Sequence, residues 1–136
     1  MLDKEVIKIA SNTENHGVLS NHTHFSKLKN AICGDEMKIY LIIKNNTITN
    51  FKYECESCIY CQASVSLLSR KAKNILIEKV KDFAQQANSY FDKNTNYFGK
   101  EWKEFDKIMT KNNISRKECL LLPINTMFNA LSKKSL

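Results

Sequence analysis

Five cysteines are the residues best suited to chemistry, and three of them are spaced three residues apart. Cys55, Cys58 and Cys61 form the run CESCIYC, a spacing that a thiolate cluster motif would have. The residues before the run alternate as in a strand and those after it follow helical spacing, so the run spans a strand-to-helix junction. Cys58 then lies near the helix start, where unpaired N–H groups and the helix dipole favour a thiolate. Cys55 and Cys61 are expected to be core or spare thiols.

The other two cysteines lie far from this run, one on each side of it. Cys33 belongs to the triplet Cys33-Gly34-Asp35, in a loop before the strongest predicted strand, where glycine permits an unusual backbone angle. Cys119 lies in the first turn of the last predicted helix. If that helix packs back onto the sheet edge, Cys33, Asp35, Cys58 and Cys119 can converge. Three thiolates and one carboxylate suit a tetrahedral zinc, or alternatively a small iron–sulfur cluster.

The elements that would position these residues follow from hydrophobic periodicity. In chain order we predict a helix at 4–10, a turn at 12–17, a strand at 18–25, a loop at 26–34, strands at 37–44 and 47–53, and helices at about 60–73, 76–90, 102–108 and 115–132. Asn45-Asn46 tolerates positive φ and predicts a tight hairpin between the last two strands. Strands followed by helices predict an α+β fold, a three-stranded antiparallel sheet with helices packed on one face.

The last helix carries two local signals. Ser115 and Glu118 fit a capping box, which predicts that the helix starts at Ser115. Pro123 lies four residues after Cys119 and leaves the carbonyl of Cys119 without its helical N–H partner, which predicts a kink beside the candidate ligand. The three histidines, His16, His22 and His24, are expected to lie outside the site.

The composition of the 136 residues predicts one domain, 1–136. A net charge of +7 raises nucleic acid as a partner, but the basic residues are spread along the chain, which favours a solvated lysine-rich surface. A basic binding module whose zinc is structural stays as an alternative of another class. The short apolar runs and the lack of signal-peptide features predict a cytoplasmic protein without membrane segments, in which disulfides are not expected.

Four segments of the sequence carry a family resemblance. They are NHGVL from Asn15, ICGDEMKIYL from Ile32, CIYCQASVSLL from Cys58 and RKECLLLP from Arg116. Together they resemble the U-type iron–sulfur cluster assembly family, which includes IscU, the NifU N-terminal domain and SufU. The resemblance implies the SufE/NifU-like α+β fold and the metal ligand set Cys33, Asp35, Cys58 and Cys119. It selects Cys58 from its run because that cysteine stands five residues before Ala63-Ser64.

Three features are similar to the SufU-like branch of this family. Glu118 stands where scaffold-type members carry a histidine, Arg116 stands three residues before the last cysteine, and a helical insertion is expected at about 90–113. The resemblance implies a zinc-dependent acceptor of persulfide sulfur from a SufS-like cysteine desulfurase. Such a protein is a sulfurtransferase-like accessory, with Cys33 and Arg116 acting in transfer and downstream scaffolds or apo-proteins as recipients. The alternative is a scaffold that assembles and transfers a [2Fe–2S] cluster.

Overall fold

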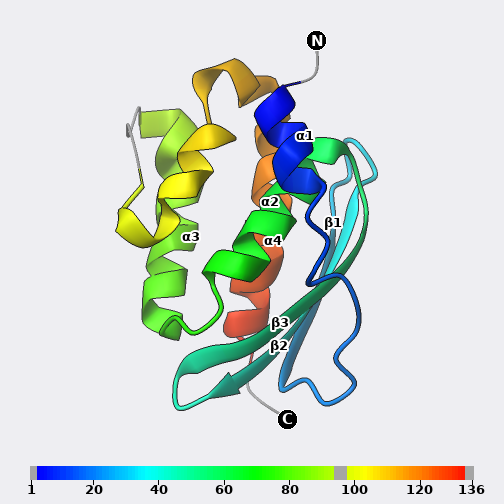
Figure 1. Cartoon of the computed structure of the whole chain (residues 1–136), viewed down its shortest axis with the longest axis vertical. Helices are drawn as coiled ribbons and strands as arrows, with labels where there is room; N and C mark the ends of the chain where they lie inside the picture. The colour runs from blue at the N-terminus through cyan, green and yellow to red at the C-terminus, as the bar shows by residue number, and fades with distance from the viewer. Residues whose placement is uncertain (1–2, 94–97, 134–136) are drawn as a thin grey trace.

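The computed structural model describes residues 3–93 and 98–133 of the chain. Its elements follow the order helix, three strands, helices (Figure 1). They are α1 (Lys4–Ala10), β1 (His24–Lys29), β2 (Glu36–Lys44), β3 (Thr47–Glu56), α2 (Ile59–Lys71), α3 (Ile77–Lys93), the 3₁₀ helices η1 (Lys100–Lys107) and η2 (Lys111–Arg116), and α4 (Lys117–Leu131).

The sheet is an antiparallel meander with the strand order β1-β2-β3. Asn45 and Asn46 join β2 to β3 with φ angles of 53° and 60°, as their tolerance of the left-handed region predicts. The hairpin pairs Met37 with Cys55 and Leu41 with Phe51. The loop before β2 and the end of β3 therefore reach the same end of the sheet.

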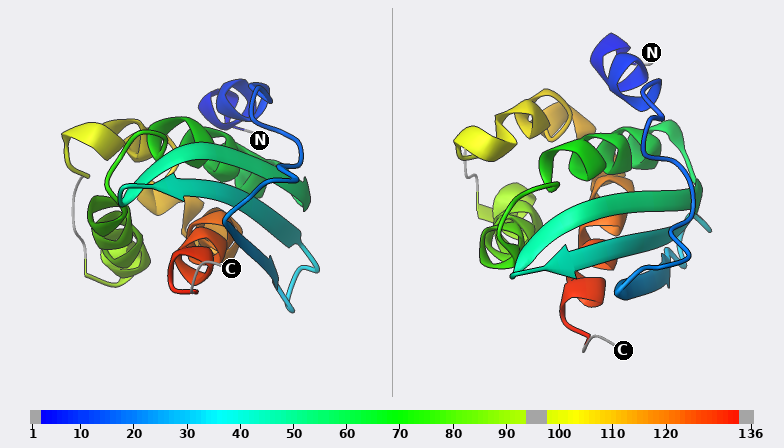
Figure 2. Two further views of the ribbon diagram at one scale, coloured as in Figure 1. Left: turned by 90° about the horizontal axis from the view of Figure 1, so that it is seen from below. Right: turned by 60° about the horizontal axis from the view of Figure 1, so that its bottom comes forward.

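The helices cover one face of this sheet (Figures 1 and 2). α2 and α4 pack against each other, α4 contacts β1 and β2, and α2 contacts β3. The β2 side chains beneath them, Met37, Ile39 and Leu41, are completely buried. The predicted α+β fold is confirmed.

The first strand is where the prediction was wrong. We expected a strand at 18–25 and a loop at 26–34, but β1 is His24–Lys29. Residues 15–17 instead hydrogen-bond to Tyr53 at the free edge of β3, and the chain then passes to β1 at the opposite edge. The centroid of the His22 ring lies 5.5 Å from that of the Tyr40 ring. The apolar residues that suggested a strand belong to this crossing segment.

The segment after α3 forms a short helix of the 3₁₀ type. Its buried residues Trp102 and Phe105 and the C-cap Ile108 recur every three positions, which is the 3₁₀ period. All three pack in the core, so the prediction of a short helix there was right. The predicted insertion at about 90–113 includes residues 94–97, which lie outside the described residues.

The last helix begins later than the capping box predicted. Its N-cap is Arg116, and no side chain caps it. Residues 111–116 form η2 instead, and the Asn113 side chain holds this turn by donating to the carbonyl of Ile108 at 2.7 Å. Ser115 therefore lies inside a 3₁₀ turn and cannot serve as the cap. α4 continues past Pro123 to Leu131.

Candidate metal centre

The loop between β1 and β2 is closed by backbone hydrogen bonds at its base. The N–H of Asn30 donates to the carbonyl of Asp35 at 2.8 Å, and the N–H of Gly34 donates to the carbonyl of Asn30 at 2.8 Å. Gly34 has φ 76°, a left-handed angle that glycine adopts without strain. The turn leaves Cys33 exposed while Asp35 is buried.

Three of the four predicted ligands meet at one point. The sulfur atoms of Cys33 and Cys119 and a carboxylate oxygen of Asp35 all lie within 4.8 Å of one another. Their elements come together at one end of the molecule, at the top of Figure 1. Residues 86 positions apart in the sequence, from Cys33 to Cys119, thus share a site.

Cys58 lies beside this group rather than inside it. It is the N-cap of α2, and its N–H donates to Oδ2 of Asp35 at 3.3 Å. Its thiol is close enough to that of Cys119 to raise the pKa of the Cys119 thiol. Cys58 is therefore held against two members of the group, and its own ligand role stays a prediction.

The surroundings of Cys119 disfavour a free thiolate there. Burial raises the pKa of the Cys119 thiol, and the hydrogen bond to Cys58 and the nearby Cys33 and Asp35 raise it further. A thiol with a raised pKa among acidic neighbours stays protonated, whereas a bound cation reverses this balance and deprotonates a coordinating thiol. Asp35 is only 8% exposed and accepts the N–H of Cys58, and a bound cation would add the positive partner that a buried carboxylate favours.

Arg116 lies at the edge of the centre. As the N-cap of α4, it is three residues from Cys119, and its guanidinium lies over the ring of Tyr60, 5.3 Å from the centroid. This cation–π contact links the start of α4 to the first turn of α2. The predicted role of Arg116 in sulfur transfer stays a prediction.

Comparison with known proteins places the chain in a family. The family model described as NifU-like N terminal domain matches residues 1–91. The chain belongs to this family. An iron–sulfur cluster assembly scaffold protein IscU from Thermotoga maritima is 26% identical over 136 residues, covering 99% of this chain and 95% of that protein.

Solved structures of NifU-like proteins share the fold. An N-terminal NifU-like protein from Brucella abortus superposes with a TM-score of 0.88 at 18% identity, covering 95% of this chain and 90% of that one. A putative scaffold protein for the SUF system from Fervidobacterium islandicum AW-1 gives 0.84 at 22% identity, covering 96% of each chain. Within the described residues of this NifU-like chain, no helix combines the length and the apolar character needed to cross a membrane.

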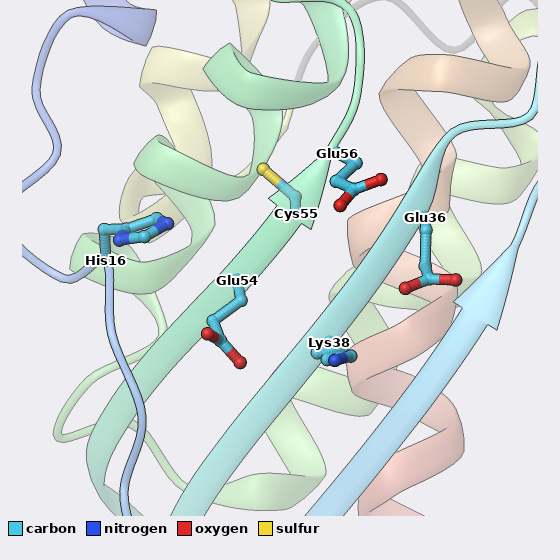
Figure 3. Close-up of a pocket in the computed structure, with 6 residues that line it drawn as sticks. All are labelled: His16, Glu36, Lys38, Glu54, Cys55 and Glu56. Atoms are coloured by element: carbon cyan, nitrogen blue, oxygen red, sulfur yellow. The ribbon is translucent and has the colours of Figure 1, made fainter.

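The two remaining cysteines of this NifU-like domain lie in β3 (Cys55) and in α2 (Cys61). Cys61 is fully buried, as expected of a core thiol. Cys55 is half-buried and lines a pocket of about 180 Å³ at the end of β3 (Figure 3). The other lining residues are His16, Glu36, Lys38, Glu54 and Glu56. Burial raises the pKa of both thiols.

These burials predict an order of thiol reactivity. We expect iodoacetamide to modify Cys33 first in the metal-free protein, because that side chain is exposed. Cys61 should stay unmodified until the chain unfolds, since burial both excludes the reagent and raises the thiol pKa. Peptide mapping by mass spectrometry measures the order. Modification of Cys61 as fast as Cys33 in the folded protein would contradict it.

Periodicity and spacing did not identify two residues that shape the centre. Asn30 closes the ligand loop, and its Oδ1 also accepts the N–H of Ile32 at 3.0 Å. Asparagine at the start of a loop is a known turn signal, so this role could have been read from the sequence. Tyr60 supports Arg116, and only the packing of α2 on α4 reveals this contact.

Proposed function

We propose that this NifU-like chain is an iron–sulfur cluster assembly protein that accepts persulfide sulfur from a cysteine desulfurase. Cys33 receives the sulfur, and Cys33, Asp35, Cys58 and Cys119 hold a zinc ion. The observation that carries the proposal is the meeting of Cys33, Asp35 and Cys119 within 4.8 Å. The reaction needs reduced thiols, so the proposal includes a reducing compartment such as the cytoplasm.

The spacing and types of the donor atoms support zinc. Zn–S bonds of about 2.3 Å in a tetrahedron place neighbouring sulfur ligands about 3.8 Å apart. Three donor atoms within 4.8 Å are close to that requirement, and Cys58, whose N–H donates to Asp35, is the fourth ligand in the proposal. A bound zinc would supply deprotonated thiols at neutral pH. Asp35 offers a harder and weaker ligand than sulfur, which suits a site that must exchange.

The transfer itself is a thiol–persulfide exchange. The Cys33 thiolate attacks the outer sulfur of the donor persulfide, a new S–S bond forms on Cys33, and the bond to the donor sulfur breaks. The donor leaves as a thiolate, and the proton of the persulfide stays on the transferred sulfur. Atoms and electrons balance without an added oxidant or reductant.

Exposure supports Cys33 as the acceptor. Cys33 is exposed, Cys58 is half-buried, and Cys119 is only 5% exposed. Beside Cys33, Ile32 is 87% exposed, a large apolar side chain available to a docked donor. A macromolecular donor can therefore reach Cys33 first, while Cys58 and Cys119 stay at the starts of α2 and α4.

The metal content of untreated protein tests the zinc site. We expect near one zinc per chain after purification without added metal, because four donors of this type bind zinc tightly. Elemental analysis of the purified chain gives the ratio, and the absorption spectrum shows whether a coloured cluster is present. A chain that carries neither zinc nor another metal, and cannot be loaded with zinc, would contradict the proposal.

A scaffold for a [2Fe–2S] cargo is the second candidate. The Thermotoga maritima relative, named as an IscU scaffold, aligns with 99% of this chain, which favours it. Anaerobic incubation with iron and sulfide would then give a chromophore that passes to an apo-protein. We expect it to be lost in both Cys58→Ala and Cys119→Ala. A colourless product after this incubation would leave the sulfur acceptor as the better function.

A further inference from the structure

A buried serine joins the two helices that carry Cys58 and Cys119. Ser64 lies on α2, six residues after Cys58, and is completely buried. Its Oγ donates to the carbonyl of Leu120 at 2.7 Å, and Leu120 directly follows Cys119. The bond thus connects the helix that begins at Cys58 to the first turns of α4.

Pro123 leaves one carbonyl group of α4 without its usual helical donor. Proline has no N–H, so the carbonyl of Cys119 lacks the donor that residue 123 would normally supply. The helix nevertheless continues through Pro123 to Leu131, so the kink predicted beside Cys119 does not interrupt α4. The hydroxyl of Ser64 holds the next carbonyl, that of Leu120, from the neighbouring helix. Ser64 therefore adds a bond from α2 at the carbonyl next to the one that Pro123 leaves without a helical donor.

We propose that Ser64 is a positioning residue that fixes the spacing of Cys58 and Cys119 for metal binding. The inference rests on the proposed function because it assumes that both cysteines are ligands. Ser64 is too deeply buried to touch the ligand or a donor protein, so it acts only through the packing of α2 on α4. Groups that hydrogen-bond to metal ligands directly typically change metal affinity 10–100-fold when replaced, so we expect the lower end of this range for Ser64, which acts through Leu120.

The chain offers a matched control two residues away. Ser66 lies on the same helix, is 1% exposed, and donates to a backbone carbonyl at 2.6 Å. That carbonyl belongs to Asn12, after α1, and Oγ of Ser66 also accepts from Arg70 at 3.2 Å. Ser66→Ala therefore removes a similar buried hydroxyl without touching α4.

Measurements of zinc affinity distinguish the role of Ser64 from that of Ser66. We expect Ser64→Ala to weaken zinc binding about tenfold in competition with a chelator of known affinity, and Ser66→Ala to leave it unchanged. Ser64→Thr keeps the hydroxyl and should restore the affinity. In a Pro123→Ala background, residue 123 regains its N–H donor, so Ser64→Ala should have a smaller effect than in the natural chain. Equal affinity losses in Ser64→Ala and Ser66→Ala would overturn the proposal, as would no loss in Ser64→Ala.

Hydrogen exchange in the metal-free protein distinguishes a failure of this inference from a failure of the proposed function. The amides of Leu121, Leu122 and Ile124 should exchange faster in Ser64→Ala than in Ser66→Ala, because the early turns of α4 open more readily. If wild-type protein binds no zinc but this difference is found, the proposed zinc site fails and Ser64 still orders α4. Identical exchange in the two variants would overturn the role of Ser64 whether or not zinc binds.

Discussion

Replacing Cys33 with serine is expected to abolish sulfur acceptance while leaving the fold intact. In the proposed exchange the Cys33 thiolate forms the new S–S bond, and a serine hydroxyl cannot form a persulfide. The side chain is exposed and lies in a loop, so the free energy of unfolding should change by no more than about 0.5 kcal/mol. Incubation with a cysteine desulfurase and cysteine, followed by intact-mass measurement, detects the added sulfur atom.

The matched control is Cys55→Ser. Cys55 is also a cysteine at this end of the sheet, but it is half-buried and lies outside the group formed by Cys33, Asp35 and Cys119. This variant should gain the sulfur atom as the natural chain does and should stimulate desulfurase turnover equally. A Cys33→Ser protein that still gains sulfur would move the acceptor role to another cysteine. No stimulation by the natural chain would contradict the partnership with a desulfurase.

Local sequence signals predicted the parts of the fold that depend on neighbours along the chain. The β2–β3 hairpin follows from strand alternation and from Asn45-Asn46, whose φ angles are positive as expected. The short helix at 4–10 and the amphipathic pattern of α3 were likewise readable. In each case the spacing of apolar residues matches a face that the helix or strand buries.

The errors fall where distant parts of the chain decide the structure. Residues 18–23 cross from the β3 edge to β1, with the His22 ring packed on Tyr40 and Val18 56% exposed, so this segment is a connection and not a strand. Ser115 fits a capping box by spacing, but the preceding 3₁₀ turn places the helix start after it. The hydrophobic spacing of the sequence does not reveal that a segment crosses between sheet edges. Nor does it reveal that a 3₁₀ turn precedes a helix.

The candidate centre was predictable in its residue types but not in its supports. Cys33, Asp35 and Cys119 were chosen from a glycine loop and a helix start, and the structure brings their ligand atoms together. Ala63-Ser64 served in the sequence only to mark Cys58, because the hydrogen bond from Ser64 to the carbonyl of Leu120 crosses the helix pair. Such contacts require the packing of α2 on α4, which hydrophobic spacing does not specify.

Replacing Phe83 with alanine is expected to have the largest effect on stability. The Phe83 ring is buried and stacks on Trp102, with 4.2 Å between the ring centroids. The centroids of Phe105 and Phe98 lie 4.8 Å and 5.3 Å away. Loss of a buried phenylalanine of this kind lowers the free energy of unfolding by about 3–5 kcal/mol. The ring also joins α3 to η1, so its removal should loosen the 3₁₀ segment from the domain.

The single tryptophan allows the effect of Phe83→Ala to be measured at η1 as well as over the whole domain. Trp102 is the only one in the chain and is 4% exposed, so its emission reports the packing of η1 while circular dichroism reports all helices. In the natural chain both signals should change at the same denaturant concentration, because we expect a single domain. Phe83→Ala should shift the Trp102 emission to longer wavelength, whereas Phe128→Ala, a half-buried change on α4, should not. If Trp102 becomes exposed well before helix is lost in the natural chain, η1 is an independent appendage and the single-domain prediction is wrong.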